Sequence, residues 1–377
     1  MPTPTPKPMR LLPPHVRPPR IARLDAPAGR LIAVSDIHGA LDYLRGLLNA
    51  VQFSPADTLV IDGDLLERGP RSLDTLRYVI ELSRTHSVRF LSGNWDWWVP
   101  ILFEYRHLDA ILYYLLHAPH GLLWQMLEEM GWPIGPDMDL AAATLAARER
   151  YPEEFAFLAA APEIYETEHL TFVHGGLPGD GPLEWDAWQC MKCDAFLRNP
   201  PHFKKWTVVG HTPVVLYHEN VVDANPILDR ERRIIAMDGG CVLKDDGQLN
   251  ALILPDEASE DFTFAAWDPF PTATVLEEQA GSAQSWYIRW GDAAVEVLDR
   301  GEEFSRIRHR RTGYEMCVLT RYLRKNGTVN DCTDYVLPLR PGDEVKVVET
   351  TSRGYFVKHR GVSGWYRGAL RFHGGEA

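Results

Sequence analysis

A short apolar run followed by a polar cluster next to glycine recurs along the first two thirds of the chain. Residues 31–34, 58–62 and 87–91 are such runs, and the segments 41–51 and 72–83 between them have helical spacing of apolar residues. Strands that alternate with helices predict an α/β architecture in which both faces of a sheet are covered. Open α/β sheets place their sites beyond the carboxyl ends of the strands, so the polar clusters mark the expected site.

The rest of the sequence predicts further parts around this core. Residues 1–25 begin with a proline-rich stretch, which predicts an extended arm, either a binding arm or an ordinary disordered terminus. We expect residues 26–255 to form the domain that contains these polar clusters, with a helical insertion at 97–162. We expect a linker at 256–272, where the regular pattern ends. A length of 377 residues suits two domains.

Residues 273–377 predict a small all-β domain with a weak internal repeat near 50 residues. The final stretch, with its Gly364–Trp365 pair, resembles bacterial Src-homology-3-like domains, which implies two such units and a peptide partner, with a purely structural appendage as the alternative. The first copy's Val295, Val297, Ile307 and His309 align with Val345, Val347, Val357 and His359.

Composition excludes some classes of protein. Lys plus Arg number 39 against 52 Asp plus Glu, and a net charge of −13 argues against a nucleic-acid partner, which would need a basic face. No apolar run approaches the roughly 20 residues of a membrane span. An odd count of 5 cysteines fits reduced thiols in a cytoplasm, and the isolated pair Cys190 and Cys193 is interpreted in the same way.

Six polar side chains at the strand ends form a candidate ligand set. Mixed oxygen and imidazole ligands suit Mn, Fe, Zn or Co better than Mg or Ca. Six ligands are too many for one catalytic zinc, whereas a shared carboxylate allows two metals about 3.5–4 Å apart. The set is Asp36, His38, Asp64, Asn94, His174 and His211.

The order of these motifs over residues 30–255 resembles the calcineurin-like metallophosphoesterases. The string GDLLERGPRSLDTL resembles the GDxVDRGPxSxE stretch of their phosphoprotein phosphatase branch. The resemblance implies a β-sandwich flanked by helices, α-β-β-α, in addition to the small all-β domain. It also implies two divalent metal ions, with manganese first and iron, zinc or cobalt as alternatives, and a hydroxide bridging them as the nucleophile.

The same resemblance assigns roles by motif. Asp36 and His38 hold the first ion, and Asp64 bridges both ions. The second ion is held by Asn94, His174 and His211. Arg68 grips a phosphate oxygen through its planar fork. Asp238 supports the site.

The first of two departures from the family pattern bears on catalysis. Trp95 stands where the family has the histidine that protonates the leaving group, and general acid help contributes about 10²–10⁴-fold. Glu67 replaces the usual aspartate, and a nearby histidine (His107, His117 or His120) could act instead. The catalytic residues expected from these motifs are Asp64, Glu67, Arg68, Asn94 and Asp96.

The second departure concerns phosphate binding by the segment between the two histidine motifs, which contain His174 and His211. Cys193 stands where the family has an arginine, and Lys192 or Arg198 could supply the missing charge. Together with Arg68 and Trp95, these two cations are the expected substrate-binding residues.

Three functions follow as hypotheses. The first is a cytoplasmic metal-dependent phosphatase that acts on phosphomonoesters of a phosphorylated protein or small molecule. The lack of a general acid biases it towards phosphotyrosine and aryl phosphates, which have good leaving groups. The second is a nucleotide hydrolase such as a diadenosine tetraphosphatase, which the many tryptophans favour because aromatic faces stack on bases. The third is a non-catalytic metal-binding scaffold protein.

Overall fold

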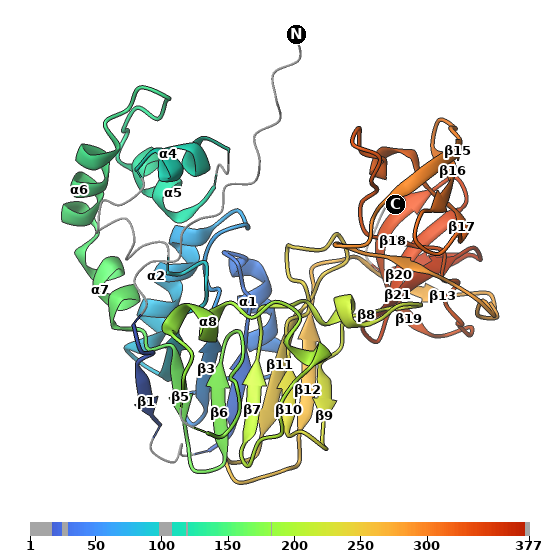
Figure 1. Cartoon of the computed structure of the whole chain (residues 1–377). Coiled ribbons are helices and arrows are strands. Elements are labelled where there is room, and N and C mark those ends of the chain that lie inside the picture. Colours follow the sequence, from blue (N-terminus) through green and yellow to red (C-terminus); the bar gives the residue numbers. More distant parts are fainter. Residues whose placement is uncertain (1–16, 25–28, 98–107, 118–119, 182, 374–377) are drawn as a thin grey trace.

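Two mixed sheets pack face to face in a computed structural model that describes residues 17–24, 29–97, 108–117, 120–181 and 183–373 (Figure 1). A buried apolar layer between the sheets includes Leu31, Phe172 and Trp206. Helices cover the outer faces, so the predicted α-β-β-α sandwich is confirmed.

The first sheet contains the strands that precede three of the expected site loops. Successive side chains of a strand point to opposite faces, so Ile32 and Val34 pack under the helices while Leu31 and Ala33 enter the layer between the sheets. Its strands, in spatial order, are β12 (Thr263–Trp267), β11 (Leu249–Leu254), β2 (Leu31–Val34), β3 (Thr58–Asp62) and β4 (Ser87–Leu91).

The second sheet contains the strands that precede the two histidine motifs. β6 and β7 are its parallel central pair, and both are buried along their whole length. In spatial order the strands are β1 (Ile21–Arg23), β5 (Ile164–Glu166), β6 (Leu170–Val173), β7 (Trp206–Val209), β10 (Ile234–Ala236) and β9 (Ile227–Asp229).

The helices fall into two covering layers and an insertion. No helix within the described residues is long and apolar enough to cross a membrane. The first layer is α1 (Leu41–Ala50) and α2 (Ser72–Ser83); the second is α8 (Ala187–Met191), η1 (Phe196–Arg198) and η2 (Val214–Tyr217); the insertion contains α4 (Leu108–His117), α5 (Leu122–Glu129), α6 (Leu140–Arg150) and α7 (Pro152–Ala160).

Two sequence-based boundaries differ from the structure. β12 lies inside the expected linker 256–272 and pairs with β11, so the first sheet continues to Trp267. β12 is an edge strand with exposed residues, and its acidic and proline-containing flanks conceal its apolar pattern. Likewise, β1 lies inside the expected arm 1–25 and pairs with β5. The first 16 residues of that arm lie outside the described residues.

The C-terminal part is all-β and has two apolar clusters of its own. Two hairpins share an irregularity: β15–β16 has a register shift between Val297 and Asp299, and β19–β20 has one between Val347 and Glu349. These positions correspond under the repeat of about 50 residues. The Src-homology-3 resemblance stays a prediction. The strands are β13 (Thr272–Val275), β14 (Tyr287–Ile288), β15 (Val295–Asp299), β16 (Phe304–His309), β17 (Glu315–Leu319), β18 (Cys332–Thr333), β19 (Glu344–Thr351), β20 (Gly354–His359), β21 (Val362–Tyr366) and β22 (Leu370–Phe372), with η3 at Thr320–Tyr322.

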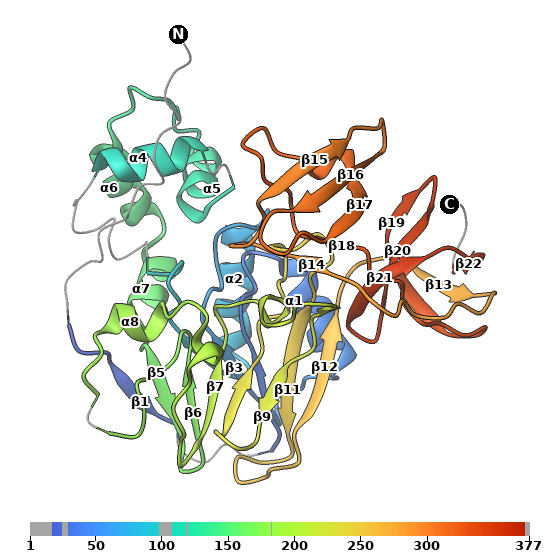
Figure 2. The same ribbon diagram turned by 45° about the vertical axis from the view of Figure 1, so that its right-hand side comes forward.

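A backbone strand joins the two parts. β8 (Val222–Asp223), from the metallophosphoesterase-like part, pairs antiparallel with β21 and so extends the C-terminal sheet. Figures 1 and 2 show the C-terminal sheets and the helices α4–α6 above the same end of the sandwich. Both additions therefore lie near the edge where the site loops are expected.

Candidate metal centre

The six expected ligands lie in the loops after β2, β3, β4, β6 and β7. Four of them have left-handed backbones, with φ of 54° at Asp36, 52° at His38, 49° at Asp64 and 66° at His211. Such a conformation costs a non-glycine residue about 1–2 kcal/mol and tends to occur where function requires it. The fold therefore holds these side chains in positions that local preference opposes.

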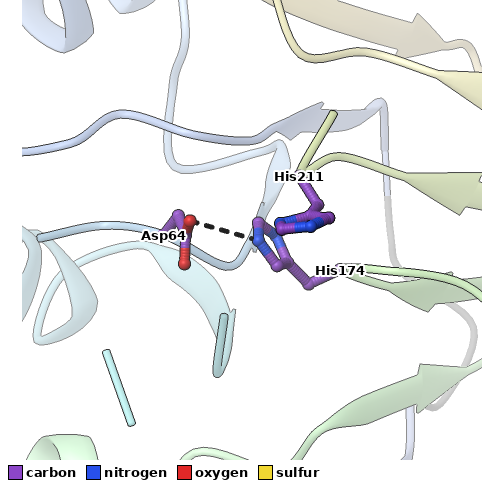
Figure 3. Close-up of side chains that lie close together, drawn as sticks. All are labelled: Asp64, His174 and His211. Carbon is purple, nitrogen blue, oxygen red and sulfur yellow. Dashed lines mark ion pairs between the residues drawn. The ribbon is translucent and has the colours of Figure 1, made fainter. Parts of the chain in front are cut away.

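The ligand atoms form two groups of three that share one carboxylate. Asp36, His38 and Asp64 make the first group, and Asp64, His174 and His211 make the second, with the ligand atoms of each group within 4.8 Å of one another. Asp64 Oδ2 lies 3.8 Å from His38 Nε2 and 3.3 Å from His174 Nε2. Figure 3 shows Asp64 directed at His174, with the His211 ring beside it.

Several buried polar atoms in this cluster have no hydrogen-bond partner among the described residues, which provides a test of the metal hypothesis. They are Nε2 of His38, Nε2 of His174, Nδ1 of His211 and Oδ1 of Asn94. An orphaned buried acceptor costs about 1–3 kcal/mol, and cations held by the two ligand groups would satisfy all four atoms. The residues present therefore fit a pair of divalent ions.

Backbone contacts orient two of the imidazoles for this role. His174 Nδ1 lies 2.9 Å from the Asp62 carbonyl oxygen, and His38 Nδ1 lies 3.3 Å from that of Leu66. A proton on Nδ1 donates to each carbonyl and leaves the Nε2 lone pair free for a metal.

Glycines let the loops approach the ligands closely. A Cβ on Gly93 would lie 2.2 Å from Asp64 Oδ1, and a Cβ on Gly210 would lie 2.3 Å from Asp36 Oδ2. Both distances are far below contact, so any side chain there would displace a carboxylate of the cluster. The glycines next to the polar residues are required by this close packing.

Burial and mutual charge set the protonation of the cluster. Burial lowers the pKa of His38 and of His211 to about 4, so both are neutral and ready to bind a metal near pH 7. Burial opposes ionisation of His174 and Asp64 as well, but with no metal ion bound their ion pair raises the pKa of His174 and lowers that of Asp64, so a metal ion at His174 Nε2 would take the place of the proton held there. Burial raises the pKa of Asp36, with the Asp238 carboxylate adding to the effect.

Asp238 lies behind the ligand groups, as expected for a supporting residue. It is fully buried, one of its oxygens accepts a 2.8 Å hydrogen bond from the Gly240 N–H, and the other has no partner. Burial raises its pKa to about 7.

The indole of Trp95 is a platform for Arg68. The Arg68 guanidinium lies 4.2 Å from the ring centroid, and the backbone N–H of Trp95 donates to Asp64 Oδ1 over 2.9 Å. Both side chains line the cavity that contains the ligand groups. The structure therefore brings both predicted substrate-binding residues to the metal cluster.

Glu67 and Asp96 lie outside the cavity lining, which differs from the direct catalytic role expected for them. Glu67 accepts 2.8 Å and 2.9 Å hydrogen bonds from the Leu122 N–H and the Tyr114 hydroxyl, which ties its loop to the helical insertion. Asp96 accepts from the N–H groups of Leu66 and Gly93 at 3.2 Å and 2.9 Å. Both carboxylates therefore accept hydrogen bonds from the segments around them, and the catalytic role expected for them stays a prediction.

The two remaining predicted cations line the same cavity. Lys192 Nζ lies 3.2 Å from His211 Nε2 and pairs with Asp194, and Arg198 lies at the end of η1. Cys190 and Cys193 are free thiols, and burial raises the pKa of both. Of the alternative acids, His117 and His120 are exposed and do not line the cavity, and His107 lies outside the described residues.

The cavity extends beyond the predicted residues into the C-terminal β-rich part. It has a volume of about 810 Å³. Sequence reasoning missed this second wall because no motif links it to the phosphoesterase loops. The one sequence feature that could have indicated this wall was Trp290, the tryptophan that follows β14. The residues of this wall that bear on binding include Lys244, Arg289, Trp290, Tyr322 and Phe356.

Comparisons with known proteins agree with this geometry. The family model of the calcineurin-like phosphoesterases matches residues 29–233, which is more than half of the chain, so the chain belongs to this family. It is 52% identical over 164 residues to the symmetrical bis(5'-nucleosyl)-tetraphosphatases of Escherichia coli O139:H28 and Shigella boydii serotype 18. These matches cover 42% of this chain and 46% of each relative, so the chain spans about half their length.

A solved structure of a cold-active protein-tyrosine phosphatase from a psychrophilic Shewanella is also similar. It is 17% identical, and the likeness covers 66% of this chain and 82% of that one at a TM-score of 0.34. A similarity at this level adds nothing to the assignment of the family.

Proposed function

We propose that the chain is a metal-dependent phosphoesterase that hydrolyses a phosphoanhydride or phosphate ester of a nucleotide. The observation that carries the proposal is the pair of ligand groups joined at Asp64, whose buried ligand atoms include several without a hydrogen-bond partner among the described residues. When bound there, two divalent ions supply charge neutralisation and a nucleophile at neutral pH.

The chain's own residues bind and orient the phosphate. Asp36 and His38 are the proposed ligands of the first ion. His174, His211 and Asn94 are the proposed ligands of the second ion, and Asp64 belongs to both ligand groups. Arg68, held flat against Trp95, presents its N–H groups to a phosphoryl oxygen in the cavity. Lys192 and Arg198 line the same cavity and add positive charge to it. Glu67 and Asp96 position the loops that hold Asp64 and Arg68.

Because position 95 is tryptophan and not the histidine of the family pattern, the site favours a substrate whose leaving group needs no proton. An indole N–H donates a hydrogen bond but has no useful acidity. Phosphoanhydrides and aryl phosphates leave without such help, whereas alkyl phosphates such as phosphoserine do not. We favour the anhydride because the relatives that match at 52% identity are named as dinucleoside tetraphosphatases. The hypothesis of a protein phosphatase for phosphotyrosine stays as the second candidate.

The test is a substrate panel with manganese-loaded protein. We expect hydrolysis of diadenosine tetraphosphate and p-nitrophenyl phosphate, with phosphoserine peptides slower by at least the roughly 10²-fold that a general acid supplies. Asp64→Asn should abolish turnover, because the change removes the carboxylate common to both groups. Retained turnover in that variant contradicts the bridging role. The absence of any turnover in the wild type favours the scaffold hypothesis.

A further inference from the structure

The second wall of the cavity contains a buried cation with an incomplete set of partners. Arg289, which follows β14, is 5% exposed and lines the cavity. Its Nη2 lies 3.3 Å from Glu219 Oε1, whereas its Nη1 is buried and has no hydrogen-bond acceptor in the part of the chain that the structure describes. Because a buried guanidinium N–H without an acceptor is costly, the site favours an anion that completes the fork.

The Glu219 carboxylate neutralises this arginine only weakly. Its side chain is 56% exposed, and an ion pair at 3.3 Å with a solvated carboxylate contributes little. Elsewhere on this wall, Lys244 is paired with Asp331, and Asp292 is paired with Arg311. The positive charge of Arg289 is therefore left available to a ligand in the cavity.

An exposed indole stands next to this arginine. Trp290 is 71% exposed, the highest value among the exposed large hydrophobic residues, and it lines the same cavity. An aromatic ring left in water beside a buried cation provides a stacking surface next to a phosphate-binding group. The cavity wall also includes Asp245 and Asp246, whose carboxylates can accept hydrogen bonds from amino and hydroxyl groups of a base or ribose.

Backbone contacts fix this wall relative to the metal centre. The Tyr287 N–H donates to the Glu219 carbonyl oxygen over 2.9 Å, and the Ala224 N–H donates to that of Gly361 over 2.9 Å. The segment that contains Glu219 and Ala224 continues directly from the metal-ligand loop at His211. The two walls are therefore tied together through the chain that holds a metal ligand.

We propose that Arg289 and Trp290 form a second subsite, which binds a nucleoside phosphate group at the far end of a substrate whose scissile phosphate lies at the metal cluster. Arg289 binds a phosphoryl oxygen and Trp290 stacks on the base. The inference rests on the proposed function, since it names the part of a nucleotide substrate that the metal centre leaves unbound. It assigns the C-terminal β-rich part to substrate selection.

The test compares two variants of the subsite with a matched control. Arg289→Gln removes the charge and leaves Glu219 solvated, and Trp290→Ala alters a residue too exposed to affect folding. Arg306→Gln is the control, because Arg306 lies in the same β-rich part, pairs with Glu315 and is not among the cavity-lining residues. The measurements are calorimetric binding of adenosine 5′-monophosphate to the manganese-loaded full chain, and kcat and KM for diadenosine tetraphosphate and p-nitrophenyl phosphate.

We expect each subsite variant to weaken adenosine monophosphate binding by about 10- to 100-fold, the range for loss of a charge-assisted hydrogen bond or a stacked ring. The ratio of kcat/KM for diadenosine tetraphosphate to that for p-nitrophenyl phosphate should fall by at least about 10-fold, mainly through KM. Arg306→Gln should leave both measurements unchanged.

The outcomes separate the subsite from the proposed function. Nucleotide binding that is absent from the wild type, or equal in the variants and the wild type, overturns the subsite even where turnover is normal. If the wild type binds adenosine monophosphate but shows no turnover, and the variants lose that binding, the subsite is supported and the proposed function is contradicted.

Discussion

Metal binding should raise the thermal stability of the chain, and each of the two ligand groups should contribute its own part of the increase. An ion present at about 100 times its dissociation constant stabilises the folded state by about 2.7 kcal/mol. For a domain of roughly 150–250 residues, each kcal/mol raises Tm by about 2–4 °C, so each ion adds about 5–11 °C. The wild type should therefore gain about 10–22 °C with manganese relative to the metal-free protein.

Single ligand changes should remove one contribution at a time. His38 belongs only to the first group and His211 only to the second, and both are neutral near pH 7 because burial lowers their pKa to about 4. Weakening an ion's affinity by about 100-fold reduces its contribution to about 0.4 kcal/mol, so His38→Ala and His211→Ala should each lose about half of the shift. Asp64→Asn should lose nearly all of it.

The assay is calorimetric Tm with and without manganese, together with the metal content of each purified variant. Comparing the Tm of each variant with and without manganese cancels the loss of stability caused by the cavity that the substitution creates. His202→Ala is the matched control, because His202 is exposed and belongs to none of the groups of described residues that could hold a metal ion. A full shift in both His38→Ala and His211→Ala would refute the two-ion centre, as would a loss of the shift in the control.

Three further predictions follow from single contacts. Trp95→His supplies an acid near the leaving group, so hydrolysis of phosphoserine peptides relative to p-nitrophenyl phosphate should rise by about 10- to 100-fold, and an unchanged ratio contradicts the missing-acid argument. Gly93→Ala should reduce metal content and turnover at least about 10-fold, because its Cβ would lie 2.2 Å from Asp64 Oδ1; wild-type activity would show that the loop can move. Contacts with Arg17 and Arg20 lower the pKa of the buried Glu163 below its ordinary 4.5, so the stabilisation is present above pH 4.5 and is lost as pH falls through the lower folded-state value. Glu163→Gln should therefore lower the free energy of unfolding by about 1–2 kcal/mol at pH 7, a range reduced because both arginines are partly exposed, and in urea titrations the difference should shrink as the pH falls below 4.5.

Local pattern was sufficient for the strands and helices that carry the ligands. The apolar runs that became β2 and β3 are buried along their whole length, and Val88, Phe90 and Leu91 of β4 are buried, so the composition of these runs reports their environment directly. The edge strands β1 and β12 were missed because one side of each contacts solvent and their apolar pattern is correspondingly weak. The repeat in the C-terminal part was detectable because both hairpins keep the same spacing and the same register shift.

The sequence by itself determined the class of site, because the ligand types and their order after successive strands depend on short segments that can be recognised one at a time. Only the tertiary structure decided how the other groups are used. Glu67 turned towards Tyr114 and away from the cavity, and Arg289 came to face the same cavity as Asp64 although far apart in the chain. The physical reason is that burial, orientation and charge pairing depend on which distant segments pack together, and no local pattern specifies those contacts.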